Sequence, residues 1–151
     1  MAVTADIYLY AKLHIGKGAA PRIDLDDANA GAFKAVLLTS AYTPALTTHD
    51  FLNDIAGEVT TNGASRLALT GVSWAINGSV IKFNCTSPIQ WTASGGLITA
   101  RYMVIYYDGG SPANDGEREL LMLIDFGADQ SAGDGTAFRV NVNASGLFTL
   151  G

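Results

Sequence analysis

The sequence has little that would suit a disulfide-bonded, membrane-spanning or nucleic-acid-binding protein. Cys85 is the single cysteine among 151 residues, so no internal disulfide can form. No apolar run approaches the roughly 20 residues of a membrane span, and the N-terminus lacks the layout of a signal peptide. The nine Lys and Arg are scattered and the net charge is -5, which argues against a nucleic-acid partner. We expect a soluble protein, with no membrane partner, that is not exported by the general secretory route.

Residues and motifs for catalysis are also scarce. The chain has two histidines, His14 and His49, and His49 cannot form a dyad with its neighbour Asp50 because adjacent side chains point apart. The sequence contains no G-x-S-x-G, P-loop, H-E-x-x-H or dinucleotide-binding motif. We therefore predict that the protein is not an enzyme and has no cofactor. A small hydrolase on a jelly-roll scaffold is the least favoured alternative.

The clearest pattern that is present is a pair of long apolar strands. Even positions of 97–107 are all apolar, and 119–126 shows the same two-residue alternation. The residues between them, 108–118, are polar and rich in turn formers. Both strands are nearly apolar on both faces at their centres, so we expect them to lie inside a sheet with other layers covering them.

Shorter segments suggest further strands and one small helix. Residues 6–15 alternate as a half-buried strand with His14 on its polar face, whereas a short helix is the less favoured interpretation. Residues 33–39 predict a buried strand, 58–60 a short one and 89–92 another. Thr47 or Thr48 could cap a helix of one or two turns that reaches Ile55.

Two hairpins are predicted in the second half of the chain. Asn77-Gly78 favours a two-residue turn that places Trp74 opposite Ile81 and Val72 opposite Phe83. Cys85 would then lie on the same buried face. Residues 127–135 are interpreted as a polar connector. Residues 138–142, a turn at 143–146 and residues 147–150 form the final hairpin, which ties the C-terminus into the sheet.

Together these segments give eight to ten strands and at most one small helix, without alternating βαβ units. The fold class predicted is therefore all-β, a single antiparallel β-sandwich domain over residues 1–151, jelly-roll-like in arrangement.

Two binding functions are weaker alternatives. Acidic loop residues could bind calcium through Asp24, Asp26 and Asp27, through Asp108, Asn114 and Asp115, or through Asp129 and Asp134, but the EF-hand spacing is missing. Aromatic side chains could line a carbohydrate-binding surface, although such residues on strands are usually core; they are Trp74, Trp91, Tyr102, Tyr106 and Tyr107. Solvated turn residues explain the acidic loops equally well, so we predict no metal.

Several stretches resemble small virion proteins of tailed bacteriophages. The residues are KAVLLTSAYTP at 34–44, THDFLNDI at 48–55, EVT at 58–60, TARYMVIYYD at 99–108, LMLIDFG at 121–127 and NASGLF at 143–148. They cover about two thirds of the chain and are structural. The resemblance implies a head decoration (cement), head or tail protein and supplies no catalytic residues.

The expected function is therefore that of a capsid decoration protein at the virion surface, made in the host cytoplasm. It would bridge subunits of the major capsid protein as a homotrimer by multivalent contact. The alternative is a tail or head-fibre module that binds host-surface carbohydrate. Polar segments outside the apolar pattern are the predicted contacts: Ala2, Thr4 and Asp6 near the N-terminus, Asp108, Ser111, Asn114 and Arg118 in the 108–118 loop, and Asp129 and Asp134 in the 127–135 connector.

Overall fold

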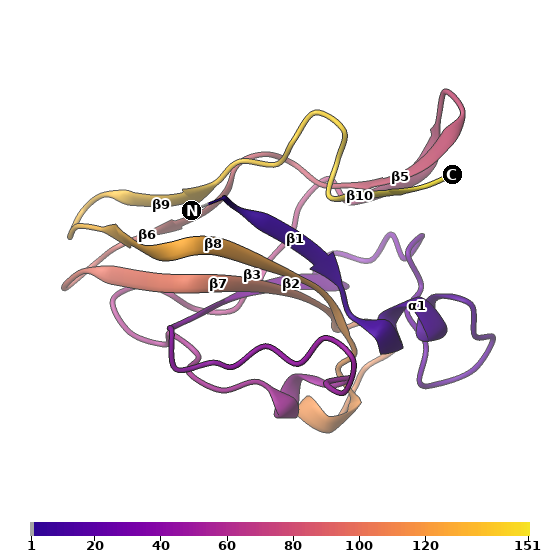
Figure 1. The fold of residues 1–151 in the computed structure, drawn as a ribbon, viewed down its shortest axis with the longest axis horizontal. Helices are drawn as coiled ribbons and strands as arrows, with labels where there is room; N and C mark the ends of the chain where they lie inside the picture. Colours follow the sequence, from indigo (N-terminus) through magenta and orange to yellow (C-terminus); the bar gives the residue numbers. More distant parts are fainter. Residues whose placement is uncertain (1) are drawn as a thin grey trace.

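The computed structural model describes residues 2–151 and has two layers of antiparallel strands (Figure 1). The first layer is a five-stranded sheet in the order β1 (Thr4–Ile7), β8 (Leu120–Ala132), β7 (Ile98–Tyr107), β2 (Phe33–Leu38) and β3 (Leu67–Ala68). The second layer contains a three-stranded sheet, β10 (Phe148–Leu150), β5 (Val80–Asn84) and β4 (Ser73–Asn77), and a two-stranded sheet, β6 (Ile89–Thr92) and β9 (Ala137–Val140). The antiparallel sandwich is confirmed, whereas the jelly-roll arrangement stays a prediction.

The predicted central pair is the backbone of the first layer. β7 and β8 pair antiparallel, with Val104 opposite Leu123, and β2 lies on the other side of β7 with Val36 opposite Val104. Both faces of these strands are buried over 102–107 and 120–124, as their continuous apolar character predicts, whereas residues 128–131 of β8 are exposed. One face contacts the second layer through Phe33 and Phe83, whose ring centroids lie 5.0 Å apart.

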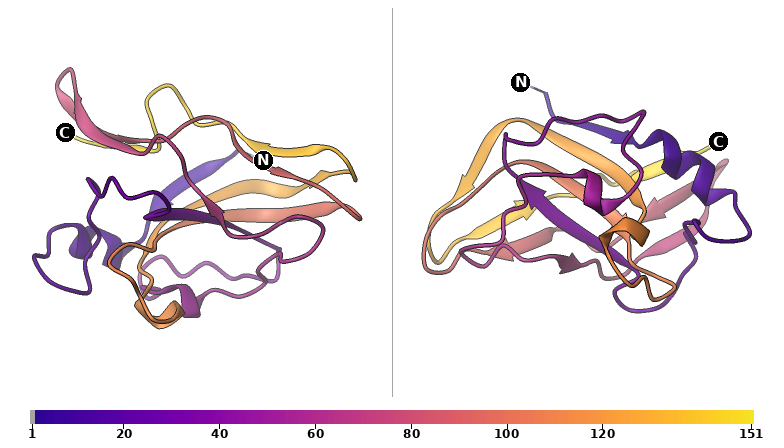
Figure 2. Two further views of the ribbon diagram at one scale, coloured as in Figure 1. Left: turned by 180° about the vertical axis from the view of Figure 1, so that it is seen from behind. Right: turned by 90° about the horizontal axis from the view of Figure 1, so that it is seen from below.

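The opposite face of the first sheet is covered by irregular chain. Segment 40–66 crosses this face, as the view from below in Figure 2 shows. Tyr42 packs edge-on against Tyr102 of β7 at 5.7 Å, and its hydroxyl lies 3.0 Å from that of the fully buried Tyr8. A loop therefore takes the place of a third layer here.

The prediction of a strand over residues 6–15 is wrong beyond Ile7. Tyr8 follows β1, and Leu9–Ile15 then forms the helix α1. Ala11 and His14 face the core at the three-residue spacing of a helix, whereas Leu9 and Leu13, assigned above to a buried face, are 52% and 56% exposed. Tertiary packing of Tyr8, Ala11 and His14 thus overrides the alternation of the aliphatic residues. None of the helices within residues 2–151 is long and apolar enough to span a bilayer.

The helix predicted near residues 47–55 is reduced to one turn of 3-10 helix, η1 (Leu52–Asp54). The cap of this helix is Asp54, and neither Thr47 nor Thr48. Its carboxylate accepts hydrogen bonds from the N–H groups of Asp50 and Phe51, which precede the helix, at 3.0 and 3.1 Å. Residues 58–60 contribute a single bridge between Glu58 and Leu38.

The hairpin at Asn77-Gly78 exists, but its register differs from the prediction. Gly78 and Ser79 form the turn, Asn77 pairs with Val80, and Trp74 lies opposite Phe83. Gly78 has φ of 65°, while neither Asn77 nor Ser79 has positive φ, which is the pattern of a turn with glycine at its first central position. Cys85 is buried as predicted, and burial raises the pKa of its thiol to about 11.

The last third of the chain is connected differently from the prediction. β8 continues to Ala132, so 127–132 is a strand and not a connector; it pairs with the start of β7 after a register shift at residues 100–102. β9 pairs with β6 and β10 with β5, so these two strands are not a hairpin. The turn at 143–146 is confirmed, with Gly146 N–H donating to Asn143 C=O at 2.8 Å, and it carries the chain from one sheet of the second layer to the other.

Candidate functional site

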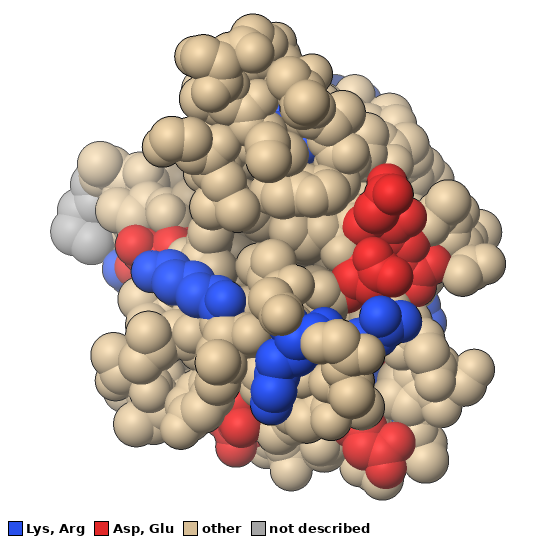
Figure 3. All heavy atoms as spheres, turned by 90° about the vertical axis from the view of Figure 1, so that its right-hand side faces the viewer, with Lys and Arg blue, Asp and Glu red and all other residues tan. Residues whose placement is uncertain are grey.

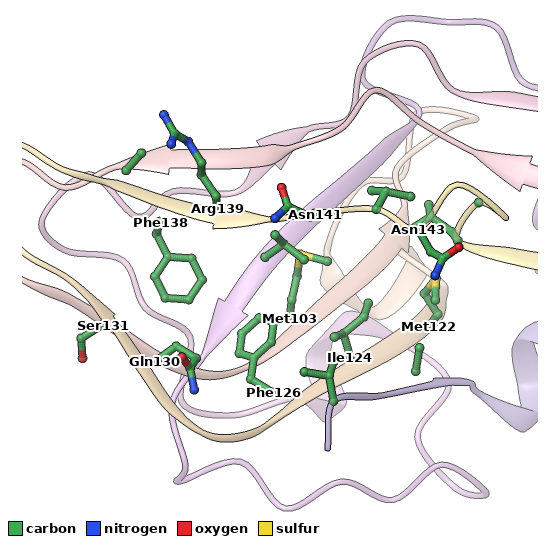
Figure 4. A pocket seen from close by; sticks show the side chains of 17 residues that line it. Met103, Met122, Ile124, Phe126, Gln130, Ser131, Phe138, Arg139, Asn141 and Asn143 are labelled. Carbon is green, nitrogen blue, oxygen red and sulfur yellow. The ribbon is translucent and has the colours of Figure 1, made fainter. Parts of the chain in front are cut away.

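A groove opens between the two layers at the edge formed by β1 and β9 (Figure 4). The cavity has a volume of about 830 Å³. β8 and β7 form one wall, and β9 with the chain that follows it forms the other. The chain between β9 and β10 lines the groove and does not pair with β1 or β8 as a strand.

The groove is apolar inside and polar at its rim. The apolar side chains come from both layers, and those of β7 and β8 point toward those of β9 in Figure 4; they include Met103, Met122, Ile124, Phe126 and Phe138. Gln130, Arg139 and Asn141 supply the polar rim. Neutral side chains dominate, and Arg139 already donates to Gln90 at 2.8 Å. This surface suits an apolar polypeptide segment better than a charged small molecule.

Two strand edges beside the groove have no partner strand within residues 2–151. β1 and β9 are terminal strands of their sheets. The N–H of Tyr8 donates to the C=O of Leu121. Because hydrogen-bonded residues alternate along an antiparallel pair, the backbone N–H and C=O of Ala5 point away from β8. On the other edge, the N–H of Ala93 donates to the C=O of Thr136. By the same alternation, the backbone groups of Ala137 and Arg139 point away from β6. Free edges of this kind can accept an added strand.

Three predicted contact residues lie on or next to β1. Ala2, Thr4 and Asp6 are all exposed, and Thr4 and Asp6 belong to an ordered edge strand and not to a flexible arm. Val3, which is 64% exposed, and Ala5 line the groove between them. The predicted N-terminal contact segment therefore borders the groove.

The 108–118 loop is held by ion pairs that the sequence did not predict. Arg118 and Lys34 both bind the carboxylate of Asp108, and Arg118 also binds Asp115 at 3.0 Å. Asp108 and Arg118 are thus paired within the chain, and their role as contact residues stays a prediction. Ser111 and Asn114 remain exposed, although Asn114 caps the short 3-10 helix η2 (Asp115–Glu117) by accepting from Gly116 N–H.

The two acidic residues of the supposed connector lie apart from the groove floor. Asp129 is exposed on β8, and Asp134 accepts a hydrogen bond from Gly95 N–H at 2.8 Å in the turn between β8 and β9. Asp27 binds Asn29 and the hydroxyl of Tyr107. Across residues 2–151 no three His, Cys, Asp or Glu side chains come together in a way that could hold a metal ion.

The aromatic and histidine side chains have structural surroundings. Four of the five aromatic residues proposed for sugar binding are buried, and the fifth, Trp74, is half-buried against Phe83 and Phe148. His49 Nδ1 lies 2.8 Å from the Tyr42 hydroxyl. His14 is buried, which lowers the pKa of its imidazole with a smaller contribution from Lys17. No carbohydrate platform can be built from these aromatic residues as placed.

A second cavity, of about 380 Å³, lies where the loop after β7 faces residues 20–22. Glu119 lines this cavity, and the sequence interpretation gave this residue no role beyond its place in the alternating segment 119–126. Glu119 is 5% exposed, and burial raises the pKa of its carboxyl group, while backbone N–H groups of Glu119 and Arg22 lower it by less. The available sequence signal was an acidic residue directly before the five apolar residues 120–124.

Comparison of the chain with protein-family models, with curated proteins and with solved structures finds no match.

Proposed function

We propose that the chain is a structural protein of a tailed-bacteriophage virion, a decoration protein that bridges subunits of the major capsid protein. The sequence resemblance suggests the class of protein. The observation that carries the proposal is the apolar groove between the free edges of β1 and β9. This arrangement can take up an extended segment of a neighbouring subunit by strand addition, with the apolar side chains of that segment in the groove.

The chemistry of the groove favours polypeptide as its occupant. Backbone N–H and C=O groups of Ala5, Ala137 and Arg139 are directed away from their own sheets and can pair with an extended chain. The walls offer apolar surface whose removal from water is worth about 25 cal/mol per Å². A homotrimer would present three such grooves at fixed spacing, so modest individual contacts would add up to firm attachment.

The first test is the position and copy number of the protein in purified particles. We expect hundreds of copies on the capsid surface. A dozen or fewer copies at a vertex or on the tail would refute decoration and favour the alternative module. Sedimentation of the free protein reports whether it forms the proposed trimer.

The second test uses two exposed aliphatic residues as a matched pair. Val3 lines the groove and is 64% exposed, whereas Leu97 is 54% exposed and does not line it. Val3→Asp should weaken binding to particles that lack the protein by at least about tenfold, because it places a charge against an apolar occupant. Leu97→Asp should bind like the unmodified protein. Equal binding by both variants would exclude the groove as the capsid-binding surface.

A further inference from the structure

The cavity above Glu119 differs from the groove in shape and in charge. It lies where β7 ends and β8 begins, away from β9. Its walls contain the rings of Pro21, Phe51, Tyr107 and Pro112 and the backbone of three glycines, Gly109, Gly110 and Gly116. The glycines leave the space open. A Cβ added at Gly109 would overlap the ring of Tyr107 and the carboxylate of Asp27, so the loop follows these side chains closely and forms a cradle.

Glu119 is held in place but is not neutralised. Its Oε1 accepts a hydrogen bond from the backbone N–H of Arg22 at 3.0 Å. Within residues 2–151 no Lys, Arg or His side chain lies within 4.0 Å of its carboxylate, and the guanidinium of Arg22 turns instead to Asp24 at 3.8 Å. A carboxylate buried to this degree is ordinarily paired, because a lone buried charge is costly.

The rest of the lining contains one cationic residue, Arg22, whose guanidinium is turned to Asp24, and one further carboxylate, so it favours a cation over an anion. Glu117 is the other carboxylate in the cavity, and its Oε2 accepts from Ala113 N–H at 2.8 Å. Phe51 and Tyr107 provide aromatic rings, which attract cations placed over their faces. Ca²⁺ takes six to eight oxygen ligands and Mg²⁺ an octahedral set, whereas no three carboxylate or imidazole groups converge here. An organic cation with an apolar stem fits these walls better than a metal ion.

We propose that this cavity binds an organic cation, an ammonium or guanidinium group carried on an aliphatic chain, and that the cation pairs with the carboxylate of Glu119. The stem would lie against Pro21, Phe51 and Pro112, as long charged side chains do when their methylene groups cover apolar surface. Two sources share this chemistry: a Lys or Arg side chain of a partner protein, and a free aliphatic amine. The site stands without the groove and without any capsid, so it goes beyond the proposed function.

The test is an NMR titration of the full chain with three probes. N-acetyl-lysine N-methylamide represents a protein side chain, 1,5-diaminopentane a free amine, and N-acetyl-norleucine N-methylamide is the neutral counterpart of the first. We expect the amide signals of Gly109, Gly110 and Gly116 to shift with a cationic probe at a Kd of about 1 mM or below, and not with the neutral one. Tighter binding of the lysine derivative assigns the site to a protein partner, and tighter binding of the diamine assigns it to a free amine.

Two variants separate the Glu119 charge from the overall charge of the protein. Glu119→Gln keeps an acceptor for Arg22 N–H and should weaken binding of the cationic probe at least tenfold, as expected for loss of a charge-assisted pair. Asp129→Asn removes the same charge from an exposed carboxylate on β8 and should leave binding unchanged. Equal shifts with the neutral probe, undiminished binding by Glu119→Gln, or no shift with either cation would overturn the proposal. If Glu119→Gln does not fold, the comparison of the cationic and neutral probes on the unmodified protein still tests the proposal.

Discussion

The guanidinium of Arg66 donates two hydrogen bonds, 2.8 and 2.9 Å long, to the carboxylate of Asp115. The same guanidinium donates two more, both 2.8 Å, to Glu58. Arg66 thus ties the covering segment 40–66 to the loop between β7 and β8, and its planar group suits two carboxylates at once.

Arg66→Met should therefore lower the free energy of unfolding by about 1–3 kcal/mol, because Glu58 loses its charged donor and Asp115 keeps only Arg118. Urea denaturation followed by fluorescence measures this change. Arg139→Met is the control, since Arg139 is exposed and makes one side-chain hydrogen bond, to Gln90; a change within about 0.5 kcal/mol is expected there. Equal losses in the two variants would contradict a special role for Arg66.

Asp108 should make the protein less stable in acid. Burial alone would raise the pKa of Asp108, but hydrogen bonds from Lys34 and Arg118 lower the pKa below its ordinary value of 3.8. The ionised form is thus favoured in the folded state, and its contribution to stability is present above pH 3.8 and is lost as pH falls through the lower folded-state pKa. Unfolding measured between pH 2 and 6 should show this loss, and it should be smaller in Asp108→Asn.

Glu119 should have the opposite effect. Burial raises the pKa of its carboxyl group above the ordinary value of 4.5, with a smaller contribution in the same direction from Glu117. The protonated form is favoured in the folded state, so this group costs stability as pH rises from 4.5 through the raised folded-state pKa, and the full cost is present above it.

Glu119→Gln removes that cost. We expect the variant to gain stability relative to the unmodified protein at pH 7 and to show no gain at pH 4, measured by urea unfolding at both values. A uniform loss at both pH values would mean that the side chain acts through packing instead of charge.

Gly78 and Gly18 form a matched pair that tests the turn of the β4–β5 hairpin. An added Cβ meets nothing within 4 Å at either position, but Gly78 has φ of 65° and Gly18 does not have positive φ. Gly78→Ala should cost about 1 kcal/mol through backbone strain, whereas Gly18→Ala should be neutral or stabilising by less than about 1 kcal/mol. Thermal unfolding of both variants checks the turn, and a neutral Gly78→Ala would contradict it.

The strongest sequence patterns predicted the centre of the fold correctly. β7, β8, β2 and β6 lie where long or clean apolar alternation placed them, because both faces or one whole face of each strand is buried. The two-residue period is reliable here because tertiary packing agrees with it, whereas the same period over residues 6–15 gave a wrong prediction.

Segments whose conformation depends on distant partners were not predictable. α1 forms because Ala11 and His14 pack beneath the sheet, and no local signal outweighed the alternating aliphatics. β9 pairs with β6 and β10 pairs with β5, and the rules for hairpins, which concern strands adjacent in sequence, do not predict such distant pairings. The hairpin β4–β5 was found, but the sequence does not show which two residues occupy its turn.

The candidate sites were likewise predictable only where they depend on local sequence. The N-terminal segment was assigned as a contact by its polarity alone, and the groove that it borders was not predicted, because the groove is lined by residues of both layers that are distant in sequence. Asp108 and Arg118 were assigned as contacts because they lie in a polar loop, yet they bind each other. Glu119 was missed because alternation gives no information on the distant segments that cover it, which include Phe51, bridged to Glu119, and Arg22, whose N–H donates to its carboxylate.

Figure 3 shows that charged groups on the end of the molecule nearest α1 lie mainly across its middle and lower part, with a largely uncharged lobe above them. The hairpin β4–β5 projects at this upper end in Figure 1, and Ile76 near its turn is 81% exposed.

The C-terminus lies beside β5, well apart from the start of β1 along the longest axis of the molecule (Figure 1). A reporter enzyme or antigen fused after Gly151 would therefore extend away from β1, whereas the same cargo fused ahead of Ala2 would crowd the strand edge. On the proposed function, foreign polypeptides for display on a particle should thus be attached at the carboxyl end.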